Sequence, residues 1–173
     1  MVEVTVARLG LDQSNNSYVL ILREKGGTRL LPIWIGQPEA ESIVMQMHNV
    51  KRPRPLTHDL CKSLIQGLGG ELTRVQITRV EKNTYFAEMH LVRGEAVVHV
   101  DARPSDSIAI ALRLAAPIFA QESLLTAVEE ETDGDGDADA EIQDATEELK
   151  LNAEQLKEYL ENLRPEDFGK FNL

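Results

Sequence analysis

The chain has 173 residues and a formal net charge of -11, from 18 Lys and Arg against 29 Asp and Glu. So acidic a total argues against a nucleic-acid-binding protein, whose usual mark is a basic face. The otherwise ordinary composition excludes collagen, a coiled coil and a wholly disordered chain. The length is sufficient for one domain of typical size plus an appendage, with a core that needs no disulfide bonds.

The elements expected within residues 1–126 are strands and helices that come in blocks. In chain order they are strands over Val2–Leu11, Tyr18–Leu22 and Leu30–Ile35, helices over Glu39–Met47 and Thr57–Leu68, strands over Val75–Val80, Tyr85–Val92 and Ala96–Asp101, and a helix over Ser105–Ala115. Thr57 and Ser105 are the expected caps of their helices. Because strands and helices do not alternate strictly, we predict an α+β fold with a mixed, largely antiparallel sheet packed with helices.

The negative charge belongs to the end of the chain. Residues 1–126 hold 14 Lys and Arg and 13 Asp and Glu, a net charge of +1, whereas residues 127–173 hold 4 and 16, a net charge of -12. We predict a domain over 1–126, an acidic disordered linker over 127–148, and a C-terminal helix and tail over 149–173. The opening argument against nucleic acid therefore does not apply to the domain.

The cellular location follows from the cysteine count and the apolar segments. Cys61 is the one cysteine and can form no intrachain disulfide, which favours a reducing compartment. The N-terminus alternates polar and apolar residues where a signal peptide would have a basic start and an apolar run. The longest apolar stretch, residues 108–120, is interrupted by Arg113 and too short to cross a bilayer of about 30 Å. We expect a cytoplasmic protein that does not enter a membrane.

The first candidate site is a basic, proline-containing turn and the helix start after it. Its residues are Lys51, Arg52, Arg54, Thr57, His58 and Asp59. Three cations held extended by prolines suit phosphate oxygens, and the N–H groups of a helix start also favour anions. A histidine there could act as a general acid or base near neutral pH. The alternative is a solvated turn in which Thr57 and Asp59 only cap the helix.

The second candidate site is the loop that joins the last predicted strand to the last helix. Two carboxylates, Asp101 and Asp106, flank Arg103 and Ser105, and could hold a divalent cation such as magnesium together with a phosphate. The alternative is that Ser105 serves only as a cap while Arg103 pairs with Asp106. Glu39, at the opening of the first helix, could join either site.

A third candidate follows from the register of one hairpin. If Gly94-Glu95 forms a two-residue turn, His90 lies opposite His99 and Glu88 opposite Asp101. Two imidazoles and two carboxylates on one face could bind a transition metal. A solvent-exposed outer face of the sheet would show the same pattern of residues, and we favour that interpretation.

Two single residues have plain interpretations. Cys61 lies three residues after His58, so the two could form a nucleophile–base pair, but a small apolar-facing cysteine is the favoured interpretation. The lone Trp34 is expected in the core or an interface in preference to a base-stacking platform.

Several segments of the chain closely resemble the bifunctional nuclease domain family. They are Gly10–Gln13, Leu31–Gly36 with Glu39-Ala40, Arg54–Leu60, and Val100–Asp106 with Ile108-Ala109. The resemblance covers about residues 1–126 in unbroken order, and Arg164–Phe168 is similar to bacterial members with a short C-terminal helix. The acidic insert is outside the shared pattern.

The resemblance implies DNase and RNase activity and a wedge-shaped homodimer of α+β subunits with a groove at the thick end. Carried over to the matching motifs, the resemblance places eight residues near that groove: Glu39, Thr57, His58, Asp59, Asp101, Arg103, Ser105 and Asp106. His90 and His99 fall outside these motifs.

The leading hypothesis is phosphodiester hydrolysis of DNA and RNA with little sequence specificity. Asp101 and Asp106 would hold a divalent ion or orient water, and His58 would transfer a proton. The phosphate would be neutralised by Arg103, and the nucleic-acid backbone would be followed by Lys51, Arg52 and Arg54. The alternative is a non-catalytic dimeric regulatory or binding protein whose groove holds an anion or a partner peptide.

Overall fold

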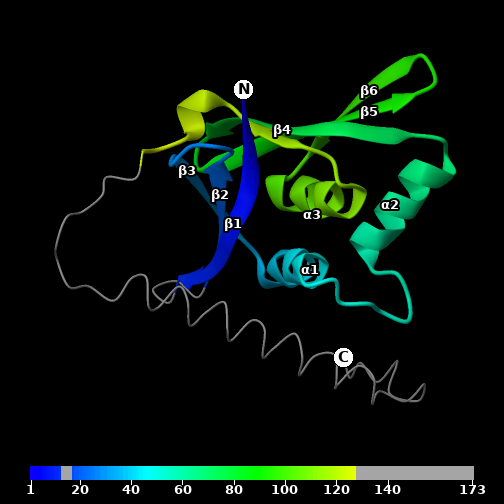
Figure 1. Ribbon diagram of the computed structural model, residues 1–173, viewed down its shortest axis with the longest axis horizontal. Helices are drawn as coiled ribbons and strands as arrows, with labels where there is room; N and C mark the ends of the chain where they lie inside the picture. Colours follow the sequence, from blue (N-terminus) through cyan, green and yellow to red (C-terminus); the bar gives the residue numbers. More distant parts are fainter. Residues whose placement is uncertain (13–16, 128–173) are drawn as a thin grey trace.

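The computed structural model describes residues 1–12 and 17–127, which form one mixed sheet with helices packed on it (Figure 1). The strands are β1 (Val2–Asp12), β2 (Ser17–Glu24), β3 (Leu30–Ile35), β4 (Glu71–Glu81), β5 (Thr84–Arg93), β6 (Ala96–Ala102) and β7 (Ile118–Ala120). The helices are α1 (Gln37–Met47), α2 (Thr57–Gly67) and α3 (Pro104–Leu114), followed by a short 3-10 turn, η1 (Glu122–Leu124). The predicted α+β fold is confirmed. The predicted acidic linker and C-terminal helix lie outside the described residues.

The sheet consists of two antiparallel halves. Its strand order is β3-β2-β1-β7-β4-β5-β6, and every neighbouring pair is antiparallel except β4 with β7. The three helices lie in the angle between the two halves (Figure 1), and α3 contacts both other helices as well as β4 and β5. Alternate strand residues such as Leu20, Leu22 and Ile77 are fully buried against this helical layer. The core therefore lies on one side of the sheet, with α3 at its centre.

The sequence reading missed β7. Residues 108–120 form one apolar run in the sequence, but α3 ends within it at Leu114, and the C-cap residue Ala115 has a left-handed φ of 53°. Pro117 follows, and proline soon after a helix end prevents its continuation. The last three residues of the run then pair with both β1 and β4. This short strand connects the two halves of the sheet.

Both predicted helix caps are wrong. The N-cap of α2 is Leu56, one residue before Thr57, and its N–H donates to Asp59 Oδ2 over 3.0 Å. The N-cap of α3 is Arg103, because Pro104 occupies the first helical position and restricts the residue before it to an extended conformation. Ser105 is buried within the first turn.

The register predicted for the β5–β6 hairpin is confirmed. His90 pairs with His99 and Glu88 with Asp101, around a turn in which Gly94 has a φ of 58°. The expectation of a wet face is wrong for His90, which is buried, although His99 is exposed.

One face of α2 is apolar and exposed. The exposed leucines recur every four residues, at Leu56, Leu60, Leu64 and Leu68. Residues four apart lie on the same side of a helix, so these leucines form one stripe. Within the described ranges, no helix combines the length and the apolar character needed to cross a bilayer.

Candidate functional site

The N-terminal halves of α1, α2 and α3 bring together polar side chains from distant parts of the sequence. We call this group the polar cluster; its members are Glu39, Ser42, His58, Arg103 and Asp106. Glu39 and Asp106 lie in the first turns of α1 and α3, where the positive end of a helix dipole stabilises a carboxylate.

A continuous chain of polar contacts connects the members of the polar cluster. Arg103 Nη2 lies 2.8 Å from Glu39 Oε1, and Arg103 Nε donates to Asp106 Oδ2 over 2.8 Å. His58 Nε2 lies 3.1 Å from Asp106 Oδ1, and His58 Nδ1 lies 2.7 Å from Ser42 Oγ. The predicted pairing of Arg103 with Asp106 is confirmed, and Glu39 does join them.

The ionised state of Asp106 determines which nitrogen of the neutral His58 ring carries the hydrogen. Burial alone would raise the pKa of Asp106, but hydrogen bonds from Arg103 and His58 outweigh it and hold that pKa below its ordinary value. An ionised carboxylate only accepts hydrogen bonds, so Nε2 of His58 carries a hydrogen and Nδ1 of the neutral ring accepts from the Ser42 hydroxyl. When His58 is protonated, the same hydroxyl can turn and accept instead. Both charge states of the imidazole are therefore hydrogen-bonded.

Ser42 positions His58 and is not placed as a nucleophile. The order Ser42–His58–Asp106 is that of a hydrolase triad, but Ser42 is only 5% exposed. A nucleophile must reach the substrate. The other members of the polar cluster are more accessible: 12% of the His58 side chain is exposed, against 66% for Arg103 and 30% for Asp106.

The low pKa of Asp106 predicts a loss of stability in acid. An aspartate in an unfolded chain titrates near about pH 3.9, so the stabilisation is complete above that pH and is lost as the pH falls through the lower folded-state pKa. We expect the difference in free energy of unfolding between wild type and Asp106→Asn to shrink on going from about pH 7 to about pH 2. Urea denaturation at both pH values measures this difference, and a constant value would contradict the prediction.

A second ion pair stabilises the packing of the three helices that carry the polar cluster. Arg113 Nε donates to Asp59 Oδ1 over 2.6 Å, and the Arg113 side chain is 3% exposed. The same guanidinium donates to the backbone carbonyls of Ala109 and Ser42. Burial alone would raise the pKa of Asp59, but Arg113 and the Leu56 N–H outweigh it and lower that pKa. Arg113 thereby ties α3 to both α1 and α2.

A hollow of about 470 Å³ lies beside Arg103. Trp34 and Tyr85 line it together with Arg103 and Ser105. Trp34 is 51% exposed and donates from Nε1 to Asp12 Oδ2 over 3.2 Å, so the expectation of a core position for it is wrong. An exposed indole and a phenol beside a guanidinium offer both stacking surface and positive charge.

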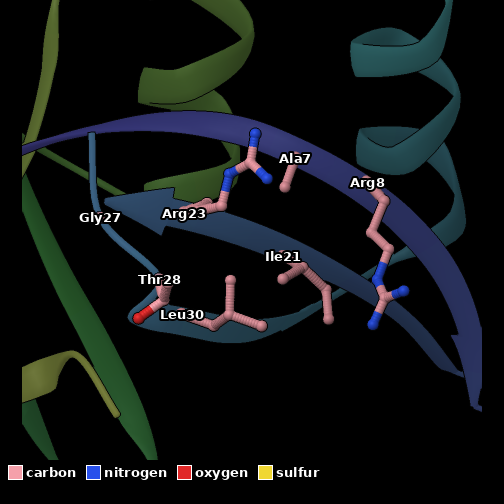
Figure 2. Close-up of a pocket in the computed structure, with 7 residues that line it drawn as sticks. All are labelled: Ala7, Arg8, Ile21, Arg23, Gly27, Thr28 and Leu30. Carbon is pink, nitrogen blue, oxygen red and sulfur yellow. The ribbon is translucent and has the colours of Figure 1, made fainter. Parts of the chain in front are cut away.

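Another hollow, of about 730 Å³, lies on the opposite face of the β1–β3 half (Figure 2). Arg8 and Arg23 line it, with Ile21 between them. Ile21 and Arg23 alternate with the buried Leu20 and Leu22, so this face points away from the helices. It has no residue in common with the polar cluster.

Comparison with known proteins identifies the family. A family model described as "Bifunctional nuclease domain" matches residues 20–133.

The chain belongs to the bifunctional nuclease domain family.

An uncharacterized protein of Mycobacterium tuberculosis is 40% identical over 169 residues, which cover 97% of this chain and 98% of that protein. Bifunctional nuclease 2 of Arabidopsis thaliana is 33% identical over 106 residues, 60% of this chain and 32% of that protein. Bifunctional nuclease 1 of Oryza sativa subsp. indica is 26% identical over 110 residues, 62% of this chain and 33% of that protein. The resemblance seen in the sequence is confirmed, and a nuclease-like function is supported.

The fold of this bifunctional nuclease domain unites some of the predicted site residues and separates others. Glu39, His58, Arg103 and Asp106 form one cluster, and Asp59 lies beside it through Arg113. Asp101 is exposed on β6 and pairs across the strands with Glu88. Ser105 is buried.

The basic turn is only partly free to meet a ligand. Lys51, Arg54 and Thr57 are exposed. Arg52 is half-buried, and its Nη2 donates to Met45 Sδ over 3.2 Å. Cys61 packs against the core, in agreement with its favoured interpretation.

Sequence reasoning missed three residues of the site. Ser42 and Arg113 are an unremarkable serine and an arginine inside an apolar run, and only the packing of α1, α2 and α3 gives them their partners. Tyr85 has no feature in the sequence beyond its place in a predicted strand. A polar residue in the apolar stretch 108–120 was the one available signal for Arg113.

Proposed function

We propose that this domain hydrolyses phosphodiester bonds of DNA and RNA in single strands, with little sequence specificity, at the polar cluster. The observation that carries the proposal is that Arg103 belongs both to the polar cluster and to the aromatic hollow. If Arg103 held a phosphate of the nucleic acid, the neighbouring bases would lie toward Trp34 and Tyr85. The ester oxygens of that phosphate would lie toward His58. Membership of the family supports this class of reaction.

Arg103 is the group proposed to bind the phosphate. Its guanidinium is fixed by Glu39 and Asp106 yet remains mostly exposed. A fixed guanidinium can neutralise charge that develops on phosphate oxygens without reorganising during the reaction. The exposed cations Lys51 and Arg54 are proposed to follow the nucleic-acid backbone, with Arg52 closer to the helices.

His58 is the group proposed to move protons. Attack of water on phosphorus forms one P–O bond and breaks another, while the water loses a proton and the leaving oxygen gains one. Because Ser42 and Asp106 hydrogen-bond the ring of His58 in both charge states, the imidazole can accept the first proton and return the second. To accept a proton at Nε2, the neutral ring must carry its hydrogen on Nδ1, where the Ser42 hydroxyl accepts it, and Nε2 must exchange its contact with Asp106 for one with the substrate or the water.

The proposal includes a divalent cation such as magnesium as a cofactor, but the contacts of the polar cluster give little support for it. Magnesium requires oxygen ligands, and the carboxylates of Glu39 and Asp106 already hold the Arg103 guanidinium. An ion could be held between them only in place of Arg103. Asp101, the other carboxylate considered for this role, is not among the contacts of the cluster described above.

The test of the function is cleavage of single-stranded DNA and RNA by the purified full-length protein, with and without EDTA. We expect the activity to elute with the protein through successive chromatographic steps and to act on both nucleic acids. Activity that separates from the protein would instead favour the non-catalytic dimeric binding protein.

Trp34 provides a test of the binding surface. We expect Trp34→Ala to weaken the affinity for a single-stranded oligonucleotide about 10-fold, because stacking one base on an aromatic ring contributes about 1–3 kcal/mol. Fluorescence anisotropy measures the affinity, and Trp34→Phe, which keeps an aromatic face, is the matched control. Equal affinity of the alanine variant and the wild type would remove Trp34 from the interface.

The predicted homodimer belongs to the same proposal. Four exposed leucines along α2 supply an apolar surface that a second copy of the chain could cover. A dimer built on this stripe would leave the polar cluster, on the first turns of the helices, near the interface.

A further inference from the structure

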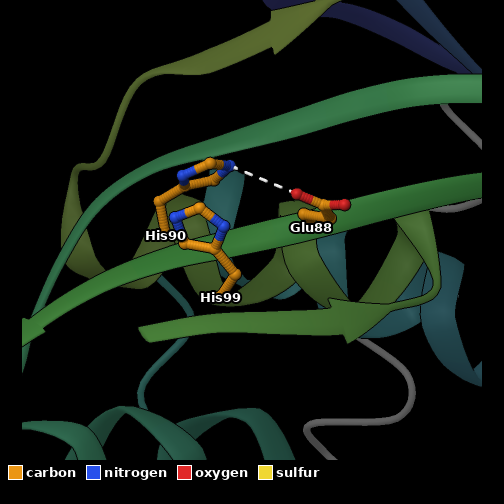
Figure 3. Close-up of side chains that lie close together, drawn as sticks. All are labelled: Glu88, His90 and His99. Atoms are coloured by element: carbon orange, nitrogen blue, oxygen red, sulfur yellow. Dashed lines mark ion pairs between the residues drawn. The ribbon is translucent and has the colours of Figure 1, made fainter. Parts of the chain in front are cut away.

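The β5–β6 hairpin carries a second group of chemically active side chains, on the sheet face away from the helices. Glu88 and His90 lie two residues apart on β5, and His99 lies opposite His90 on β6 (Figure 3). Glu88 and His90 alternate with Ala87 and Met89, which belong to the core on the helical side. The group is therefore separated by the sheet from the polar cluster, with which it shares no residue.

The three side chains are close enough to hold one ion. One ligand atom from each of Glu88, His90 and His99 lies within 4.8 Å of the other two. The two imidazole rings have centroids 4.1 Å apart. His90 Nε2 and Glu88 Oε2 are 3.6 Å apart, too far for a good hydrogen bond. Two ligands of a tetrahedral ion with bonds near 2.1 Å would be separated by about 3.4 Å.

The buried nitrogen of His90 lacks a hydrogen-bond partner. The His90 side chain is 7% exposed, and its Nε2 is buried without a partner among residues 1–12 and 17–127. Most buried polar atoms in native proteins are satisfied, and leaving one unsatisfied is costly. Figure 3 shows that this nitrogen points toward the Glu88 carboxylate. An ion between the two would satisfy both.

The charges around the three side chains partly offset one another. Burial lowers the pKa of His90, and the nearby charges of Arg74 and His99 lower it further, against the opposing effect of Glu88. The Arg74 charge opposes any cation, and the Glu88 carboxylate offsets it.

We propose that Glu88, His90 and His99 bind one divalent transition-metal ion such as Zn²⁺. Two imidazoles and a carboxylate suit zinc or cobalt, whereas magnesium and calcium prefer oxygen ligands. Three protein ligands leave at least one coordination position for water, and the exposure of His99 gives solvent access to it. The ion also fastens β6, an edge strand whose residues are exposed except for the last.

Calorimetric titration of the chelator-treated full-length protein with Zn²⁺, in excess Mg²⁺, tests the site directly. We expect one ion per chain, and an affinity at least about 10-fold lower in His99→Ala, because loss of a ligand costs at least as much as loss of a group that merely orients one. Glu88→Gln is expected to weaken binding in the same direction. His48→Ala, which removes an exposed histidine at the end of α1, is the matched control and should bind like wild type.

Thermal denaturation provides a second measurement. Zn²⁺ should raise the Tm of the wild type and of His58→Ala, but not that of His99→Ala. Unchanged Zn²⁺ affinity in His99→Ala, an equal loss in His48→Ala, or displacement of Zn²⁺ by equimolar Mg²⁺ would overturn the proposal. None of these readouts depends on nuclease activity, so the two proposals can fail separately.

Discussion

Replacement of His58 by alanine is expected to lower the rate of single-strand cleavage by about 100- to 10 000-fold, the range that a positioned general acid or base contributes. The imidazole is the one group of the polar cluster that can both accept and donate a proton near neutral pH. Its two nitrogens are held by Ser42 and Asp106, so the proton positions are defined before substrate binds. Single-turnover rates on a labelled oligonucleotide measure the effect.

Two further variants separate chemistry from structure. Ser42→Ala removes only the hydroxyl that orients the ring, so it should lose less activity than His58→Ala and show a changed pH profile. His48→Ala should cleave at the wild-type rate. Circular dichroism must show that all three variants are folded; a folded His58→Ala that cleaves at the wild-type rate would exclude His58 from the mechanism.

Replacement of Asp59 by alanine is expected to lower the free energy of unfolding by about 3 kcal/mol, which places it at the low end of the range for breaking a buried ion pair. The loss arises because the Arg113 guanidinium, with a 3% exposed side chain, keeps its charge without a counter-ion. The N–H of Leu56 also loses its acceptor at the start of α2. The low end of the range applies because Asp59 itself is 33% exposed.

Chemical denaturation measures this loss, and the matched control is an exposed ion pair. Glu81→Ala breaks the contact between Glu81 and Arg79, whose side chains are 60% and 50% exposed respectively. This change should alter stability little. The double variant Asp59→Ala with Arg113→Met should recover part of the loss, since no unpaired buried charge remains. Equal effects of Asp59→Ala and Glu81→Ala would show that the pair is only a surface contact.

Local sequence patterns predicted most strands and helices because each depends on residues close in the chain. The β5–β6 register followed from a two-residue turn at Gly94-Glu95, since a turn fixes every later pair of a hairpin. The caps at Thr57 and Ser105 were wrong by one and two residues. At the start of α2, the Asp59 side chain accepts a hydrogen bond from the N–H of the N-cap residue Leu56. At the start of α3, Pro104 occupies the first helical position, so the N-cap is Arg103.

The candidate site was predictable in composition and not in its connections. Glu39, His58, Arg103 and Asp106 stood out as polar residues at helix starts. The contact of Ser42 with His58 spans 16 residues, and that of Asp59 with Arg113 spans 54. Such contacts depend on how three helices pack, which no local pattern encodes. The core position considered for Trp34 was wrong for the same reason, because an apolar strand residue does not show which sheet face is covered.

The position of β7 has a consequence for how the chain folds during synthesis. β1 through β3 and β4 through β6 can each form hairpins as soon as they leave the ribosome, since their partners are neighbours in sequence. The two hairpin units cannot join into one sheet until Ile118–Ala120 has emerged, because β7 lies between them. Ile118 of β7 pairs with Val4 of β1 on one side and with Val75 of β4 on the other. Contacts so distant in sequence form late and slowly. A nascent chain that stops before residue 118 therefore holds two unpaired sheet edges, β1 and β4, and depends on rapid completion of synthesis to avoid aggregation through them.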